Sequence, residues 1–295
     1  MVTHSELGEF LRVRRAALQP EDVGVLNYGI RRVPGLRREE LAMLAGVSTT
    51  YYTRLEQGLS TNASEAVIGA IARALNLGND ERAHLFNLAR PGKAKRRTPV
   101  KPDKVRPGTL RLIQSMSGTP AVVMGRRSEV LAWNALGHRL VAGHLDFAAP
   151  ETPSTRPNMT RLLFLDHHTR ELYTRWPEEA RRAVASLRLL AGKSADDHEL
   201  ASLLGELTLK SQEFAKLWAK HPVENCMSGL KYMHHPEVGY LELNFEVLTP
   251  PDESGHRVLL YAADPGTPAA AAVQLLQGAS EIEAAPRRTA NKVHP

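Results

Sequence analysis

Four polar residues in one short segment have the side chains and the spacing to read DNA bases. An arginine guanidinium can make a bidentate hydrogen bond to guanine, and a threonine can hydrogen-bond a base edge or place its methyl group against thymine. In a helix over residues 48–57, all four would lie opposite the apolar Tyr52 and Leu55. We therefore predict that this face enters the major groove with the following side chains outward: Thr49, Thr50, Thr53 and Arg54.

The residues around this segment predict a helix-turn-helix over residues 38–58. Gly46 stands where the first helix ends and a left-handed backbone is needed, which glycine adopts without strain. Ser48 is a favourable N-cap for the second helix, and Ala42 is small enough for that helix to cross close to it. Four apolar residues are expected to fill the corner from inside: Leu41, Val47, Tyr52 and Leu55.

Basic residues around the motif are expected to contact DNA phosphates. Arg37 and Arg38 open the first helix, where they can position the protein on the backbone without reading sequence. The charge distribution agrees, because residues 1–106 hold 18 Lys and Arg against 11 Asp and Glu, whereas the rest of the chain holds 20 against 21. Arg31 and Arg32, in the preceding loop, either reach the backbone or lie in a solvated turn.

Composition and element pattern divide the 295 residues into four regions. Residues 1–90 read as an all-α domain of five helices. Residues 91–107 are basic and rich in proline, which is typical of a linker, although a basic arm on DNA is the alternative. Residues 108–277 follow as a second domain, and residues 278–295 are a polar tail expected to be disordered.

The second domain reads as α+β with an antiparallel sheet. Two strands joined by a hairpin turn precede a helical run, and three strands follow it, so helices are expected on one face with room for a pocket. The predicted strands span residues 120–124, 130–133, 228–234, 238–248 and 257–261. The predicted helices span residues 109–116, 135–142, 158–165, 172–175, 178–191, 196–220 and 268–277. This order is compatible with a PAS-like fold.

Candidate ligand contacts in this domain are few. Trp133 and Asn134 stand where a strand ends and a helix begins. Arg161 lies in an otherwise apolar helix near Phe164, where its guanidinium could hold a ligand carboxylate. The alternative for Arg161 is an internal ion pair with an acid such as Glu179.

The sequence contains no pattern typical of a metal, cofactor or catalytic site. Asp166-His167-His168 and His234-His235 hold adjacent histidines, whose side chains point to different faces, and no HExxH or CxxC spacing occurs. The single cysteine, Cys226, has no nucleophile elbow or oxyanion loop around it. We therefore expect no metal, no cofactor, no catalytic residue and no disulfide. With no signal peptide and no apolar stretch of about 20 residues, a cytoplasmic protein without membrane insertion is expected.

Residues 36–89 resemble the lambda-repressor-like, or XRE, helix-turn-helix family. The resemblance lies in LRREELAMLAGVSTTYYTRLEQG and SEAVIGAIARALNL. More narrowly, RRVPGLRREELAMLAGVSTTYYTRLEQG and NDERAHLFNLA are similar to bacterial regulators of the MmyB/MltR-like group. Further stretches extend the likeness to about residues 6–277: EVLAWNALG, NMTRLLFLD, EFAKLWAKHPV, HPEVGYLELNFEVL and YAADPGTP.

The resemblance implies a transcription regulator. Residues of this chain that match the DNA contacts of the general family are Arg38, Thr49, Thr50 and Arg54. The second domain is implied to be a PAS-like sensor of an apolar or fatty-acid-like small molecule. Because one module reads only a few base pairs, a homodimer on double-stranded operator DNA is expected. The alternatives are a second domain that is only a dimerisation or partner-binding scaffold, or one that is an enzyme.

Overall fold

The computed structural model describes residues 6–25, 35–60, 63–89, 104–194, 196–252 and 254–284. They form two compact units, of which the first lies within residues 6–89 and 181–225 and the second within residues 104–180 and 226–284. Helices from within the region expected to be the sensor therefore pack with the N-terminal helices. The possible backbone contacts of Arg31 and Arg32, most of the linker and the end of the tail lie outside the described residues.

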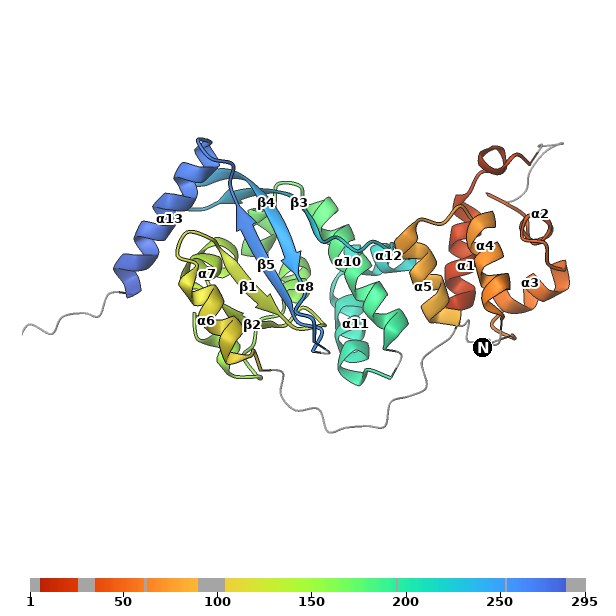
Figure 1. Cartoon of the computed structure of the whole chain (residues 1–295), viewed down its shortest axis with the longest axis horizontal. Coiled ribbons are helices and arrows are strands. Elements are labelled where there is room, and N and C mark those ends of the chain that lie inside the picture. Colours follow the sequence, from red (N-terminus) through yellow and green to blue (C-terminus); the bar gives the residue numbers. More distant parts are fainter. Residues whose placement is uncertain are drawn as a thin grey trace, which may run out of the picture. The chain divides into compact units, whose positions relative to one another are not determined.

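The described part of residues 6–89 contains five α-helices, as predicted (Figure 1). They are α1 (Glu6–Ala17), α2 (Arg38–Leu44), α3 (Thr49–Glu56), α4 (Glu65–Ala74) and α5 (Asn79–Ala89), with a short 3-10 helix, η1 (Pro20–Val23). Apolar residues at helical spacing meet in one core, where Phe10 and Leu11 of α1 contact the same cluster as Ile68 and Ile71 of α4. All four side chains are fully buried.

Three further helices complete the first unit: most of α10 (Trp176–Lys193), α11 (His198–Lys210) and α12 (Gln212–Ala219). The sequence predicted one continuous helix over 196–220, and that prediction is wrong at Ser211. The Ser211 backbone is extended, with φ −131° and ψ 112°, and its side chain accepts a hydrogen bond from the Phe214 amide at 3.2 Å. A serine that caps the following helix in this way ends the preceding one.

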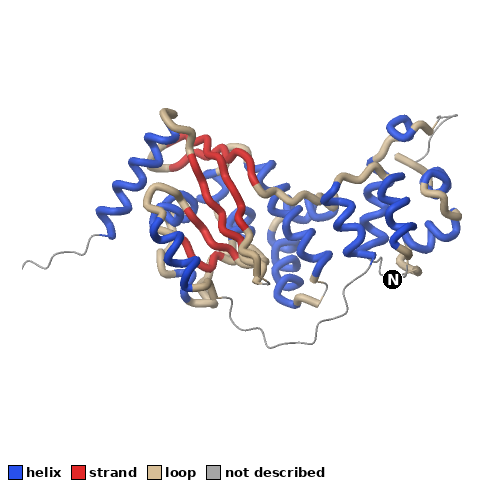
Figure 2. The backbone as a smooth tube through the Cα atoms, in the orientation of Figure 1, coloured by secondary structure: helices blue, strands red, loops and turns tan. Residues whose placement is uncertain are grey.

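The second unit is built on a five-stranded antiparallel sheet, drawn in red in Figure 2. Its strands are β1 (Ala121–Met124), β2 (Val130–Trp133), β3 (Ser228–His235), β4 (Gly239–Leu248) and β5 (Arg257–Ala262), in the order β2-β1-β5-β4-β3. Every residue of β1 and β2 is buried, whereas β4 alternates, with Leu241, Leu243 and Phe245 inward. The sheet confirms the predicted α+β class.

Helices cover this sheet and connect its strands. They are α6 (Pro107–Ser115), α7 (Ala135–Ala142), α8 (Met159–Leu165), α9 (His167–Leu172), the first turn of α10 and α13 (Pro268–Ala284), with the short η2 (Ala149–Glu151). The helix predicted over 172–175 is wrong, because Asp166 caps an earlier helix by accepting from the Thr169 amide at 2.8 Å. Helix α13 continues past residue 277, where the tail was expected to begin. No helix in the described ranges combines the length and apolar character of a membrane span.

Candidate nucleic-acid interface

The corner of the helix-turn-helix has the predicted backbone geometry. Gly46 has a φ of +66°, and the Val47 amide donates to the Ala42 carbonyl at 3.0 Å, which closes the turn. The Ser48 hydroxyl accepts from the Tyr51 amide at 3.2 Å, as expected of an N-cap. These contacts fix the direction in which α3 leaves α2.

Helix α3 separates an apolar face from a polar one. Tyr52 and Leu55 are fully buried in the core of the first unit. Thr49, Thr50 and Arg54 are exposed, and Thr53 is half-buried beside them. The structure therefore brings all four predicted base-reading residues to the outer side of one short helix. Such a surface can present hydrogen-bond donors and methyl groups to base edges in a major groove.

Arg38 is held in place by a buried carboxylate. Glu56, only 3% exposed, accepts from Arg38 Nε at 2.9 Å and from Arg15 Nε at 2.8 Å, so that it ties α1, α2 and α3 together. Burial would raise the pKa of Glu56, but hydrogen bonds and charges from Arg15 and Arg38 lower it below its ordinary value. The Arg38 side chain remains 43% exposed, and Arg37 beside it is exposed.

Sequence reasoning missed this carboxylate, although its position along the helix indicates it. Glu56 lies four residues after Tyr52, which was expected to face inward, and residues four apart share a helix face. A charged residue on a buried face needs a partner of opposite charge. The partner Arg15, which lies on α1, could not be identified from local spacing.

A buried arginine joins α10 and α12 to α1. Arg188 is 1% exposed, its Nη1 donates to Glu6 Oε2 at 2.8 Å, and its guanidinium lies 3.5 Å from the centre of the Trp218 ring. Nearby, Arg14 of α1 donates to the His221 carbonyl at 2.7 Å. Helix α10 and His221, which follows α12, therefore both contact α1.

Two histidines are buried in this contact. Burial first, and the charge of Arg188 second, lower the pKa of His84 to about 4 and that of His221 to about 3. Arg14 also faces both rings, and Lys193 adds to the positive charge near His84. Both imidazoles are therefore neutral in the folded protein near pH 7.

We expect the first unit to lose stability as the pH falls from about 6.5 to 4. An unfolded histidine, with a pKa of about 6.5, binds a proton that the buried neutral ring cannot accept, so the unfolded state gains protons first. For His84 the resulting loss in the free energy of unfolding is about 2 kcal/mol at pH 5.

Hydrogen exchange of α1 and α5 peptides measured from pH 7 to 5 tests this expected loss of stability. The His84→Gln variant should show a flatter pH dependence, whereas the control variant of the exposed His167, His167→Gln, should leave it unchanged. A profile that His84→Gln does not alter would contradict it.

Asn134, a predicted ligand contact, hydrogen-bonds to the protein backbone through both ends of its side-chain amide. Its Oδ1 accepts from the amides of Ala121 at 3.0 Å and Gly137 at 2.7 Å. Its Nδ2 donates to three carbonyls at the end of α6 and the start of β1: those of Ile113, Met116 and Thr119. This buried amide holds α6, β1 and α7 together.

Of the other three predicted ligand residues, Trp133 and Phe164 also make contacts within the protein, and Arg161 lies on the surface. Trp133 Nε1 donates to the Phe147 carbonyl at 2.9 Å, and Phe164 packs edge-on against Trp176 with ring centres 5.5 Å apart. Arg161 is exposed on α8. Glu179, the alternative partner of Arg161, forms a buried ion pair with Lys231. Whether Trp133, Asn134, Arg161 or Phe164 touches an effector stays a prediction.

Two hollows in the second unit have the size of small-molecule sites. One, of about 400 Å³, is lined by residues of α7, α9 and the turn from β3 to β4. The other, of about 420 Å³, lies over β3, β4 and the start of α13, where Leu230, Tyr232, Met233 and Leu241 contribute apolar walls. None of the four predicted ligand residues lines either of these hollows.

Two family models match the chain. One, described as the MmyB-like transcription regulator ligand binding domain, matches residues 105–276. The other, described as a helix-turn-helix domain, matches residues 6–85. No curated protein matches the chain. The two matched ranges run from α1 into α5 and from α6 into α13.

Proposed function

The chain belongs to the MmyB-like transcription regulators, and we propose that it reads double-stranded operator DNA through the outer face of α3. The observation that carries the proposal is the exposure of Thr49, Thr50 and Arg54 on a helix whose opposite side is fixed in the core. Arg54 is assigned to a guanine, the threonines to neighbouring base edges, and Arg37 and Arg38 to phosphates. A homodimer in the cytoplasm would place two such helices on a two-fold operator.

We further propose that α10 links effector binding to DNA binding. Its first turn belongs to the second unit, where Glu179 pairs with the buried Lys231 of β3. The rest belongs to the first unit, where Arg188 bonds to Glu6 of α1. An effector that binds one arrangement of α10 more tightly than another would shift α10 toward that arrangement and so change operator affinity. Because linkage between binding sites is reciprocal, operator DNA would change effector affinity by the same factor.

The effector is proposed to be apolar or fatty-acid-like. Leu230, Met233 and Leu241 in the hollow over β3 and β4 support the apolar part, and the polar Glu242, Asn244 and Asp264 line the same hollow. A carboxylate would need a cation, and Arg161 is the residue that we assign to it from the sequence. Because Arg161 does not line this hollow, the structure supports the apolar body of the ligand more directly than its acid group.

Native mass spectrometry of the full chain, followed by solvent extraction, tests the effector proposal. We expect protein purified under gentle conditions to carry one small molecule per chain, and the extract to contain an apolar compound. The Leu241→Arg variant, which places a charge in the hollow, should lose this mass, whereas Glu246→Arg, at an exposed position of the same strand that does not line the hollow, is the control. Wild-type protein that stays empty when offered a range of lipids, or Leu241→Arg protein that retains the molecule, would contradict the proposal.

A further inference from the structure

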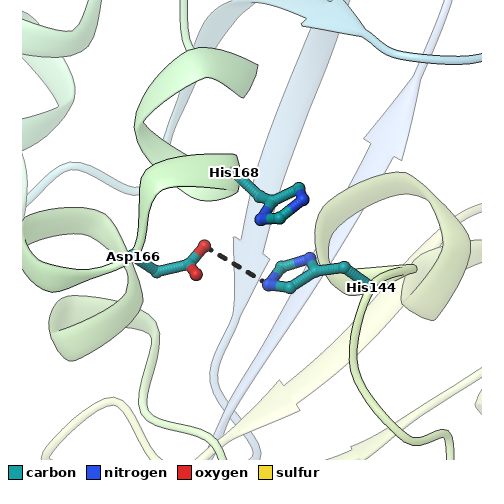
Figure 3. A group of neighbouring side chains, drawn as sticks. All are labelled: His144, Asp166 and His168. Atoms are coloured by element: carbon teal, nitrogen blue, oxygen red, sulfur yellow. Dashed lines mark ion pairs between the residues drawn. The ribbon is translucent and has the colours of Figure 1, made fainter.

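Three side chains that are good metal ligands converge in the second unit, as Figure 3 shows. His144 follows the end of α7, Asp166 lies between α8 and α9, and His168 is in the first turn of α9. One ligand atom from each lies within 4.8 Å of the others. His144 Nε2 is 3.3 Å from Asp166 Oδ1, and the two imidazole rings stack with centres 4.6 Å apart.

We propose that His144, Asp166 and His168 bind a divalent transition-metal ion of the zinc class. Two imidazole nitrogens and one carboxylate oxygen are a common ligand set for zinc, and imidazole ligands disfavour calcium and magnesium. Ligand atoms around a tetrahedral zinc lie about 3.3 Å apart, given bonds of about 2.0–2.1 Å. Because the ligand atoms already lie within 4.8 Å of one another, the distances between them need to shorten by at most about 1–1.5 Å. Rotation of the side chains can supply this change.

The carboxylate of this cluster is oriented in advance. Thr169, which is 1% exposed, donates to Asp166 Oδ1 from both its amide and its hydroxyl, each at 2.8 Å. Hydrogen bonds to a ligating carboxylate are a regular feature of metal sites because they fix its direction.

The cluster opens onto the hollow of about 400 Å³. His144 and His168 both line this hollow, together with Thr169 and His234. An ion held by three protein ligands keeps a coordination position for water or for an atom of another ligand. The hollow gives that position access from solution, so the site can accept an ion and, on the ion, a small ligand with an oxygen or nitrogen donor.

Sequence reasoning missed this cluster for a physical reason. The expectation of no metal rested on adjacent histidines, which cannot both face one ion. The structure uses only His168 of its pair and adds His144 from a separate helix end. The three ligands all belong to the second unit, and the site requires neither operator binding nor an apolar effector.

Titration of the untagged full chain with Co²⁺, after removal of bound metal by a chelator, tests the site. Co²⁺ is the probe because its visible absorption reports imidazole and carboxylate coordination, and Zn²⁺ is then used to displace it. We expect one Co²⁺ per chain, displaced by Zn²⁺. The variants His144→Ala and His168→Ala should each weaken binding by about tenfold or more.

The matched control is His167→Ala, since His167 is adjacent to His168 but lies outside this three-residue cluster and is 79% exposed. This variant should bind Co²⁺ as the wild type does. Circular dichroism of each variant establishes that it is folded, and two separate histidine variants keep the test valid if one is not. Wild-type protein that binds no Co²⁺, or equal binding by folded His144→Ala, His168→Ala and His167→Ala, would overturn the proposal.

Discussion

Replacing Arg54 with alanine is expected to weaken binding to the cognate operator by about 5- to 150-fold, with a much smaller effect on random DNA. A bidentate bond from arginine to guanine supplies about 1–3 kcal/mol of discrimination, and a difference of about 1.4 kcal/mol changes affinity tenfold. Arg54 is exposed on the outer face of α3, next to the first-turn Thr50. The measurement is fluorescence anisotropy on a duplex selected from a random library by the full chain.

Two further variants separate base reading from charge. Arg54→Lys retains the positive charge but not the planar fork, so it should keep affinity for random DNA and still lose discrimination. Arg73→Ala removes an equal charge from the exposed side of α4 and serves as the matched control, with small and similar losses on both duplexes. Equal losses on operator and random DNA for Arg54→Ala would show that this residue contacts only phosphate.

Replacing Glu56 with alanine is expected to open the N-terminal helices far more often than any surface substitution. Removal of one partner from a buried ion pair costs about 3–5 kcal/mol, because the remaining charge is left uncompensated. Here Arg15, whose side chain is 11% exposed, would lose its carboxylate, and Arg38 would lose the group that holds it at the start of α2. Amide hydrogen exchange in α1, α2 and α3 should accelerate by roughly 100- to 5,000-fold.

Hydrogen exchange also supplies the controls for this variant. Peptides from β3 and β4, in the other unit, should exchange at the wild-type rate in the same sample. Glu39→Ala removes the same charge from an exposed position on α2 and should change exchange by less than about threefold. Wild-type exchange rates in α1 to α3 of Glu56→Ala would mean that the carboxylate does not hold these helices together.

The parts of the interface that sequence predicts well are those that local chemistry decides. Gly46, Ser48 and the inward pair Tyr52 and Leu55 act through their own backbone or through residues one helical turn away. The sheet was predictable for a similar reason, because its strands alternate or run apolar between clear turns. The helical pattern over residues 196–220 did not predict the break at Ser211, where a capping hydrogen bond ends one helix and begins the next.

The features that sequence did not predict depend on residues far apart in the chain. Arg188 is buried where Glu6 of α1 and Trp218 of α12 meet it. His144 and Asp166 come together only because the end of α7 lies beside the start of α9. Spacing along one element carries no information on such pairs. The division of the chain into units has the same origin, since residues 181–225 fold with the N-terminal helices although they lie within the sensor sequence.

The most direct test of a regulator that reads operator DNA through α3 is the ratio of its dissociation constants for random and selected duplexes, measured with ligand-loaded and ligand-stripped full chain. We predict a ratio of about 10³ or more in one of these states, and a changed affinity for the selected duplex when the ligand is removed. A ratio near one in both states would contradict the assignment of sequence reading to Thr49, Thr50 and Arg54.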